Sequence, residues 1–125
     1  MGSSARSDLK TVLRIDFPNK ARIGRGKMQL LEHIRATGSI SAAGRAMDMS
    51  YRRAWLLVSA MNSMFSHAVV DSQRGGKLGG GAVVTEFGEE LLNRFRSMEN
   101  KLNEAVADDI EWLHANRNKP AAGDQ

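Results

Sequence analysis

Residues 39–55 read SISAAGRAMDMSYRRAW, a pattern that predicts two short helices joined by a tight turn. Ser39 suits the N-cap of the first helix, because its hydroxyl can accept a bond from a free N–H of the first turn. Asp48 begins the turn, and a second helix is expected over about residues 50–65. This spacing is typical of a helix-turn-helix, whose second helix enters the major groove of DNA.

Residues 68–85 read AVVDSQRGGKLGGGAVVT, which predicts two short strands around a glycine-rich loop. The strands are expected at residues 68–73 and 82–84, because both runs are rich in valine. Five of the eight residues 74–81 are glycine, which tolerates positive φ and therefore favours a hairpin tip. A basic hairpin directly after a helix-turn-helix is the arrangement of a wing.

The segments before this motif predict one strand and one helix. Apolar and polar residues alternate over residues 9–17, which favours a half-buried strand whose inward residues are Leu9, Thr11, Leu13, Ile15 and Phe17. A loop containing Gly24 and Gly26 is expected next. From Lys27 apolar residues recur at helical spacing, and Gly38 is a plausible helix stop.

Residues 86–115 are expected to form one long helix with Thr85 as its cap. Apolar residues recur along it every three or four positions, over a length that one small body cannot cover. The stripe therefore predicts pairing with a second copy of the chain. The expected dimer contacts are Leu91, Phe95, Met98, Leu102 and Val106.

These elements together predict a fold that is mainly α with a small β-wing: a winged helix-turn-helix with a long C-terminal dimerisation helix. The chain of 125 residues fits one modest domain. We expect a flexible N-terminus at residues 1–8, the DNA-binding domain at 9–85, the dimerisation helix at 86–115 and a flexible tail at 116–125.

The net charge of +4 is unevenly distributed along the chain. Residues 1–84 contain thirteen Lys and Arg against five Asp and Glu, whereas residues 85–125 contain five against nine. A basic front half followed by an acidic helical half predicts a body that binds a polyanion and an arm that faces elsewhere.

Composition also limits the compartment. Cysteine is absent, so neither disulfides nor a cysteine-based zinc site can form, and nothing argues for an oxidising environment. No apolar run approaches the roughly 20 residues needed to cross a bilayer, and the polar start lacks the apolar core of a signal peptide. We therefore expect a cytoplasmic protein with no membrane partner.

Arg52 and Arg53 are the main candidates for reading bases, because they lie in the first turn of the predicted recognition helix. An arginine there can grip guanine O6 and N7 with both arms of its guanidinium. Contact with phosphates alone is the open alternative. The helical projection places Leu56 on the same free side, and it places Trp55 toward the packed side, where core packing is its expected role.

Further DNA contacts are expected around this helix. Ser50 can cap the second helix and donate to a phosphate, and Tyr51 either donates to a phosphate or packs. The start of the preceding helix offers Ser39 and Ser41. On the wing, Arg74 and Lys77 suit the minor groove or adjacent phosphates, with a solvated hairpin as the alternative.

Other chemistry finds little support in the residues. The glycines fit neither a P-loop nor a dinucleotide fingerprint. His33, His67 and His114 are scattered, without the spacing of a metal site. No nucleophile, base and orienting group stand together, so we expect no cofactor, no metal and no enzymatic activity.

Three segments in order, Gly38–Ala43, Met49–Trp55 and Gly75–Gly88, resemble the N-terminal winged-helix domain of the ModE family of molybdate-dependent transcription regulators. The resemblance covers about residues 9–110. It implies a homodimer held by helical arms, a recognition helix that starts at Ser50, a wing at 74–81 and a palindromic DNA site. Family members carry a further oxyanion-binding region, whereas this chain ends soon after the predicted long helix, so we expect no molybdate binding by it.

These observations predict a sequence-specific, DNA-binding transcription regulator of a bacterial type, with double-stranded DNA as its partner. The first alternative is a winged-helix module for protein interaction or dimerisation without sequence-specific DNA binding. The second is a small enzyme. Salt separates the regulator from the interaction module, because DNA binding weakens steeply as the salt concentration rises and apolar helix pairing does not.

Overall fold

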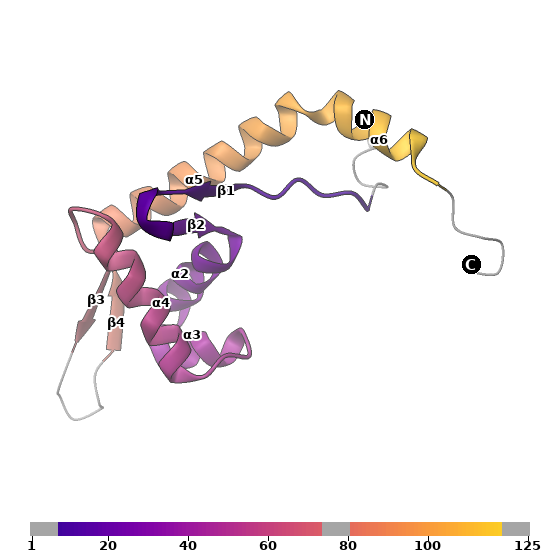
Figure 1. Ribbon diagram of the computed structural model, residues 1–125. Coiled ribbons are helices and arrows are strands. Elements are labelled where there is room, and N and C mark those ends of the chain that lie inside the picture. Colours follow the sequence, from indigo (N-terminus) through magenta and orange to yellow (C-terminus); the bar gives the residue numbers. More distant parts are fainter. Residues whose placement is uncertain (1–7, 74–80, 119–125) are drawn as a thin grey trace.

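The computed structural model describes residues 8–73 and 81–118 of the chain, and its fold is mainly α, as expected (Figure 1). Within those residues there are five α-helices and two small antiparallel sheets of two strands each. In chain order the elements are β1 (Arg14–Asp16), a 3-10 turn (Pro18–Lys20), β2 (Arg22–Gly24), α2 (Arg25–Thr37), α3 (Ile40–Ala46), α4 (Tyr51–Met64), β3 (Val70–Gln73), β4 (Gly81–Val84), α5 (Glu86–Ala105) and α6 (Ala107–Asn116).

The N-terminal segment differs from the expected single strand. Burial alternates over residues 9–17 as predicted, but only β1 is paired, with Ile15 opposite Ile23 of β2. The predicted loop around Gly24 is therefore partly a strand. Two consecutive residues of positive φ, Asn19 and Lys20, turn the chain back on itself, and Ile23 is then buried in the core.

Helix α2 begins two residues earlier than expected and ends at the expected glycine. Gly38 has a φ of 72°, a left-handed conformation that glycine adopts without a steric penalty. Its N–H donates to the Ile34 carbonyl over 2.7 Å, and its own carbonyl accepts the Ala82 N–H of β4 over 2.9 Å. The end of α2 is thereby joined to the second sheet.

Helices α3 and α4 are joined by a short turn and capped as predicted. The Ser39 hydroxyl oxygen accepts the Ala42 N–H over 3.0 Å, and the Ser50 oxygen accepts the Arg53 N–H over 3.1 Å. Asp48 takes a positive φ of 58° in the turn between them. Hydrogen bonds of this kind satisfy helix-end donors, so both helices have defined starts.

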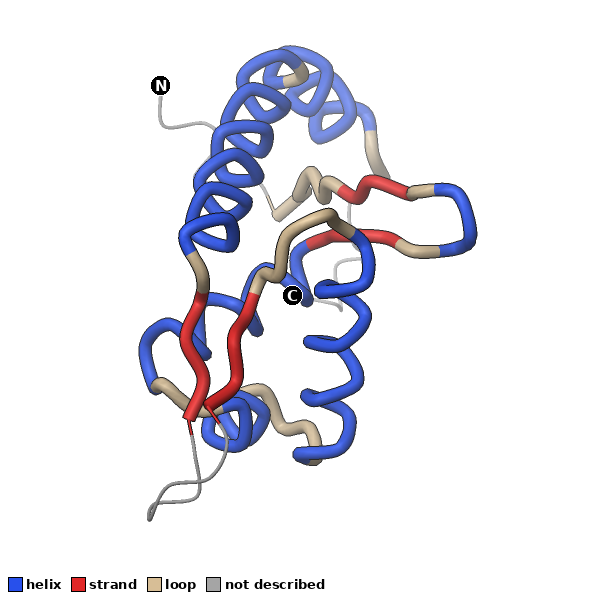
Figure 2. Tube along the Cα trace, turned by 90° about the vertical axis from the view of Figure 1, so that its left-hand side faces the viewer, coloured by secondary structure: helices blue, strands red, loops and turns tan. Residues whose placement is uncertain are grey.

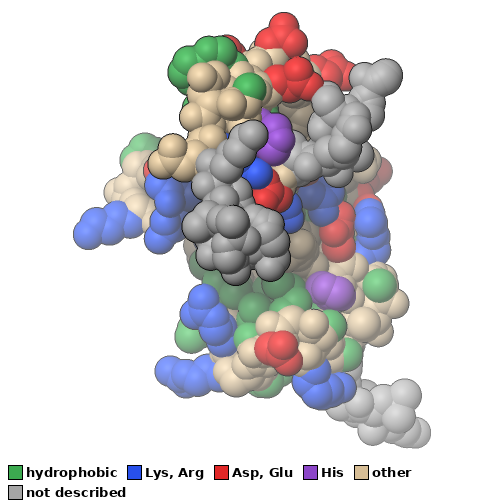
Figure 3. All heavy atoms as spheres, turned by 90° about the vertical axis from the view of Figure 1, so that its right-hand side faces the viewer, with side chains coloured by type: hydrophobic (Ala, Val, Ile, Leu, Met, Phe, Trp, Pro, Cys, Tyr) green, Lys and Arg blue, Asp and Glu red, His purple; other side chains and the backbone are tan. Residues whose placement is uncertain are grey.

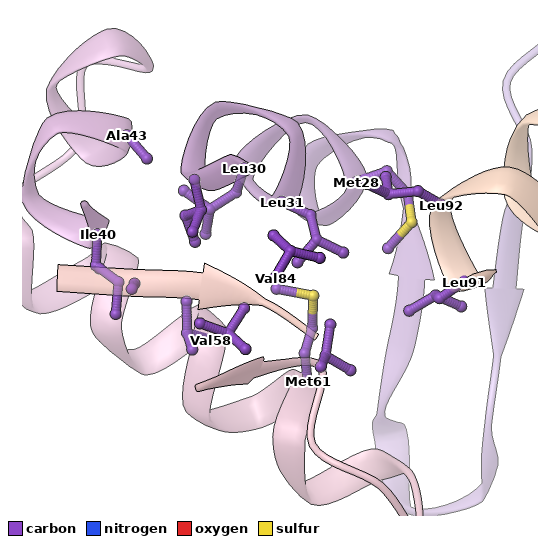
Figure 4. Close-up of a cluster of buried hydrophobic side chains, with 14 of the residues drawn as sticks. Met28, Leu30, Leu31, Ile40, Ala43, Val58, Met61, Val84, Leu91 and Leu92 are labelled. Atoms are coloured by element: carbon purple, nitrogen blue, oxygen red, sulfur yellow. The ribbon is translucent and has the colours of Figure 1, made fainter. Parts of the chain in front are cut away.

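One hydrophobic core joins the elements of the body (Figure 4). Its buried side chains come from β2, α2, α3, α4, the second sheet and the first half of α5, and include Leu31, Ile40, Val58, Val84 and Leu92. Because α3 and α4 share this core with α2 and α5, their exposed faces are held in a fixed relation to the rest of the body.

The β3–β4 hairpin is fastened to α4 by the side chain of Asn62. Its Oδ1 accepts the N–H groups of Val69 and Val70 over 2.7 and 3.1 Å, and its Nδ2 donates to the Val70 carbonyl over 3.0 Å. Thr85 caps α5 as predicted, since its Oγ1 accepts the Gly88 N–H over 3.0 Å. The hairpin therefore has a set orientation relative to the end of α4.

The expected single helix over residues 86–115 is two helices. Val106 ends α5 and begins α6, with φ −106° and ψ 10°. Valine is a weaker helix former than its neighbours, and Asp108 and Asp109 favour the positively polarised start of a new helix, which explains a break at this point. Helix α6 extends to Asn116, a residue that the sequence assigns to the tail.

Ion pairs link α5 to α2 over the body. Arg96 donates from Nε to Glu32 over 3.0 Å and from Nη1 to Glu99 over 2.7 Å, and Arg35 pairs with Glu89 over 2.8 Å. The hydrogen bonds from Glu32 and then Glu99 raise the pKa of Arg96 above its ordinary value. Beyond these contacts α5 and α6 leave the body as an arm, and the extended residues 8–13 run beside it (Figure 1).

The described helices include none with both the length and the apolar character needed to cross a membrane.

Candidate nucleic-acid interface

Three features meet at one end of the body: α3, the start of α4 and the end of the β3–β4 hairpin at which Gln73 pairs with Gly81. Figures 1 and 2 show the hairpin strands pointing toward the same end of the molecule at which α4 begins. The arm leaves from the opposite end (Figure 1). We name the surface formed by these three features the lower face.

Arg52 and Arg53 are both exposed in the first turn of α4, as the sequence predicted. Helix α4 contains no acidic residue, and within the described chain neither guanidinium makes an ion pair. Five other arginines are paired with carboxylates: Arg14, Arg35, Arg94, Arg96 and Arg117. The lower face thus presents cations whose charge no neighbouring carboxylate neutralises.

The predicted hydroxyl contacts occupy different environments. Ser50 is exposed at the start of α4, whereas Ser39 and Ser41 are half-buried at the start of α3. Ser41 Oγ accepts a hydrogen bond from Arg45 Nη1 over 3.0 Å, which orients an exposed guanidinium that the sequence prediction missed. The spacing of four residues on one helix was the signal that could have identified this pair.

The prediction that Trp55 packs in the core is wrong, because its side chain is 45% exposed. Tyr51 is 56% exposed, so of its two expected roles it does not pack, and Leu56 is 49% exposed on the free side as expected. The reason is that small or slender residues, Ala54 and Val58, form the packed side of α4. The packed stripe is narrow, and Trp55 lies about 100° around the helix from Ala54.

The two predicted wing residues, Arg74 and Lys77, lie outside the described residues. The strands that lead to them are described, and they pair in register from Val70 opposite Val84 to Gln73 opposite Gly81. Strand β3 begins two residues later than the sequence predicted, and β4 begins one residue earlier. Within the described strands of the hairpin, Val83 of β4 is a large exposed apolar side chain, at 52%.

Two of the five predicted dimer contacts are buried in their own chain. Phe95 is fully buried and Leu91 is 9% exposed, because the first half of α5 packs on the body. Met98 is half-buried against the same core. Leu102 and Val106 are half-buried farther out, on the arm. A periodic apolar stripe does not reveal which of its parts a chain covers with its own residues.

The arm exposes other apolar side chains. Trp112 is 64% exposed and Leu113 is 49% exposed on α6, and Val12 is 62% exposed in the extended segment. Arg117 pairs with Asp8 over 2.7 Å, so the end of the arm is tied to the start of that segment. Figure 3 shows acidic side chains gathered over the arm at the top of the view, with Lys and Arg below them.

Known proteins resemble the chain over much of its length. It is 47% identical over 79 residues to the molybdenum-pterin-binding protein MopB of Rhodobacter capsulatus, and 38% identical over 98 residues to MopA of the same organism. It is 35% identical over 86 residues to the DNA-binding transcriptional dual regulator ModE of Escherichia coli. The chain is a homologue of ModE and of the Mop proteins. No protein-family model matches it.

The homology covers unequal shares of the proteins. The alignments include 63% of this chain with MopB, 78% with MopA and 66% with E. coli ModE. They include only 29%, 37% and 33% of those relatives. The chain thus spans about a third of the length of these ModE and Mop homologues, which are regulators and molybdenum-binding proteins rather than enzymes.

Proposed function

We propose that this ModE homologue is a sequence-specific DNA-binding transcription regulator that acts as a homodimer on a palindromic operator. In this proposal α3 and α4 form a helix-turn-helix, α4 is the recognition helix, and the hairpin with its loop at residues 74–81 is the wing. The observation that carries the proposal is the pair of exposed guanidiniums, Arg52 and Arg53, on a helix without acidic residues.

The first turn of a recognition helix reaches base edges in the major groove, which is the position of both arginines. A free guanidinium can bind guanine O6 and N7 in a bidentate fork, because no carboxylate has to be displaced first. Ser50 and Tyr51 flank this turn and suit phosphate oxygens, and Ser41 holds Arg45 beside them. Ser39 serves chiefly as a cap.

The arm is proposed to join two copies of the chain. Its exposed Trp112 and Leu113, with half-buried Leu102, Val106 and Ile110, offer apolar surface outside the body's own core. A symmetric pair would present two recognition helices, and a palindrome with half-sites one or more helical turns apart would match them. These arm residues take the place of Leu91 and Phe95 as proposed dimer contacts, because Leu91 and Phe95 are buried in the core of their own chain.

We propose that the protein binds DNA in the cytoplasm and catalyses no reaction. ModE of E. coli is named a DNA-binding regulator, whereas MopA and MopB are named for binding molybdenum-pterin. We assign the described residues the DNA-binding role for which E. coli ModE is named.

A second candidate function is a protein-interaction module built on the same fold. The observation in its favour is the set of large exposed apolar side chains on α4 and on the arm, which includes Trp55 and Trp112. On this view the basic charge of the lower face is incidental.

Selection from random DNA with the purified chain tests the two functions. We expect enrichment of a palindrome, with a logarithm of the association constant that falls linearly with the logarithm of the salt concentration, by about 0.9 per phosphate neutralised. Failure to enrich any sequence, or binding that salt does not weaken, would contradict DNA recognition and favour the interaction module.

A further inference from the structure

Helix α4 carries large apolar side chains on the surface that we propose to enter the major groove, so a role for them in DNA recognition rests on the proposed function. Tyr51, Trp55 and Leu56 are 56%, 45% and 49% exposed. All three lie in the first two turns of α4. Single exposed apolar residues are ordinary on protein surfaces, whereas three within six positions of one helix form a candidate binding surface.

The apolar side chains surround one of the free arginines. With 3.6 residues per turn, Arg52 lies about 60° around the helix from Trp55 and about 40° from Leu56, on opposite sides. Its charge is unpaired within the described chain, and the nearest charged neighbour on the helix is Arg53. The surface therefore alternates apolar, cationic and apolar across the helix.

This charge pattern favours nucleic acid over protein as the occupant. An apolar patch that shares its helix with two arginines and no acid is complementary to a polyanion, although the exposed Asp48 lies in the preceding turn. Among the base edges in the major groove, the apolar feature is the 5-methyl group of thymine, which apolar side chains contact directly. The chemistry of the patch thus matches thymine methyls on either side of a guanine.

We infer that Trp55 and Leu56 determine sequence specificity by packing against the 5-methyl groups of thymines that neighbour the guanine bound by Arg52. The arginine selects guanine by hydrogen bonding, and the two apolar side chains select thymine over cytosine or uracil by burying a methyl group. Half-sites of the operator accordingly contain thymine within one or two base pairs of that guanine.

Replacing thymine by uracil in the operator DNA tests this inference, because the change removes one methyl group and leaves the base pairing intact. Each thymidine of the selected operator is replaced in turn, and the dissociation constant is measured by fluorescence anisotropy with the whole chain at fixed salt. Loss of one buried methyl weakens binding about fourfold. We expect that loss at one or two positions of each half-site.

Protein variants then assign the methyl contact to a residue. Trp55→Ala and Leu56→Ala remove exposed side chains, so both variants should fold as the parent does. Leu113→Ala is the matched control, because Leu113 has the same 49% exposure as Leu56 but lies on α6. At a position read by Trp55 or Leu56, the fourfold uracil penalty should vanish in the corresponding variant and persist in the control.

The remaining outcomes each overturn the inference. If the parent binds its operator with no uracil penalty anywhere, or if both variants keep the parent's penalties, thymine methyls are not read by these side chains, while the proposed function stands. If the recovered operator has no thymine near the guanine, the inference fails in the same way. If selection enriches no sequence, the proposed function and the inference fail together.

Discussion

Helix α4 and the arm both expose tryptophan and leucine, but the charges around these side chains have opposite signs. Trp55 and Leu56 stand on a helix with two basic residues and no acidic one. Trp112 and Leu113 stand on α6, where Asp108, Asp109 and Glu111 are the charged residues beside His114. The two surfaces lie at different ends of the molecule (Figures 1 and 3).

The comparison teaches that apolar exposure alone does not identify a partner. Cations around an apolar patch favour a polyanion. An acidic rim repels the DNA backbone and leaves the apolar side chains for contact with protein. We therefore assign DNA to α4 and a second copy of the chain to the arm, and each assignment can be broken separately.

Disrupting the arm should have the largest effect on operator affinity. Trp112→Glu combined with Leu113→Glu places charge at the two most exposed apolar positions of the proposed dimer surface, so we expect a folded monomer. Without the second recognition helix, affinity for the palindrome should fall by about 100-fold or more. Sedimentation equilibrium reports the oligomeric state, and anisotropy with whole and half operators reports the binding.

The control for that change is Asn103→Glu, which adds charge to an exposed arm position without removing apolar surface. This variant should dimerise like the parent. If the double variant also remains a dimer, the arm does not join the two copies, and its apolar side chains have another partner.

Arg52→Ala and Arg53→Ala probe the other surface. Loss of a bidentate contact to guanine should weaken operator binding by about 5- to 150-fold for each variant that removes one, which corresponds to about 1–3 kcal/mol. Dimerisation should be unchanged, because both side chains belong to the first turn of α4, and α4 begins at the end of the body away from the arm (Figure 1). Arg94→Ala on α5 is the matched control, since it removes an exposed arginine already paired with Glu90.

The two arginines can also be told apart by base specificity. A variant that loses a base contact should tolerate other bases at one operator position, whereas a variant that loses only a phosphate contact should weaken binding to all sequences and reduce the salt dependence. Operator binding equal to the parent's in both variants would show that α4 is not the recognition helix.

Much of the fold could be predicted from the sequence because local signals and burial agree. The caps at Ser39, Ser50 and Thr85 and the glycine stop at Gly38 all rest on short-range chemistry, and each is confirmed. The alternation of burial over residues 9–17 is confirmed for the same reason. These features depend on neighbours in sequence, which a single chain displays directly.

Features that depend on tertiary packing were not predictable in this way. The apolar stripe of α5 does not state that Phe95 is covered by the body while Leu113 is not. Trp55 has a core-like residue type, and only the narrow packed side of α4 leaves it exposed. The roles of the candidate DNA contacts remain predictions, of which the variants above test Arg52 and Arg53, and the domain boundaries remain predictions as well.

The variant Gly44→Ala tests how closely α3 and α4 must approach for the lower face to form. A Cβ added there would lie 3.0 Å from the Ala54 Cβ and 3.3 Å from the Met49 carbonyl oxygen. We expect Gly44→Ala to lower the free energy of unfolding by about 1 kcal/mol, since overpacking exceeds the gain in helix propensity. Gly26→Ala is the control, because nothing lies within 4 Å of its added Cβ.

The two alanine variants should therefore shift urea denaturation midpoints in opposite directions, with Gly26→Ala stabilising by up to about 1 kcal/mol. In operator binding only Gly44→Ala should weaken affinity, since it alters the angle between the two helices. Equal stabilisation by both changes would mean that the contact between α3 and α4 has room to spare, and that the lower face is less rigid than the packing of Gly44 against Ala54 indicates.

The smallest expected effect concerns the tie between Asp8 and Arg117 at the end of the arm. The hydrogen bond from Arg117 lowers the pKa of Asp8 below its ordinary value. Because the folded-state pKa is the lower one, the tie stabilises the folded arm above the unfolded pKa and is lost as the pH falls through the folded value. Carbon-13 NMR should record this depressed titration, and Arg117→Ala should return it to the ordinary range. Ordinary titration in the parent would mean that this pair does not hold residues 8–13 to the end of the arm.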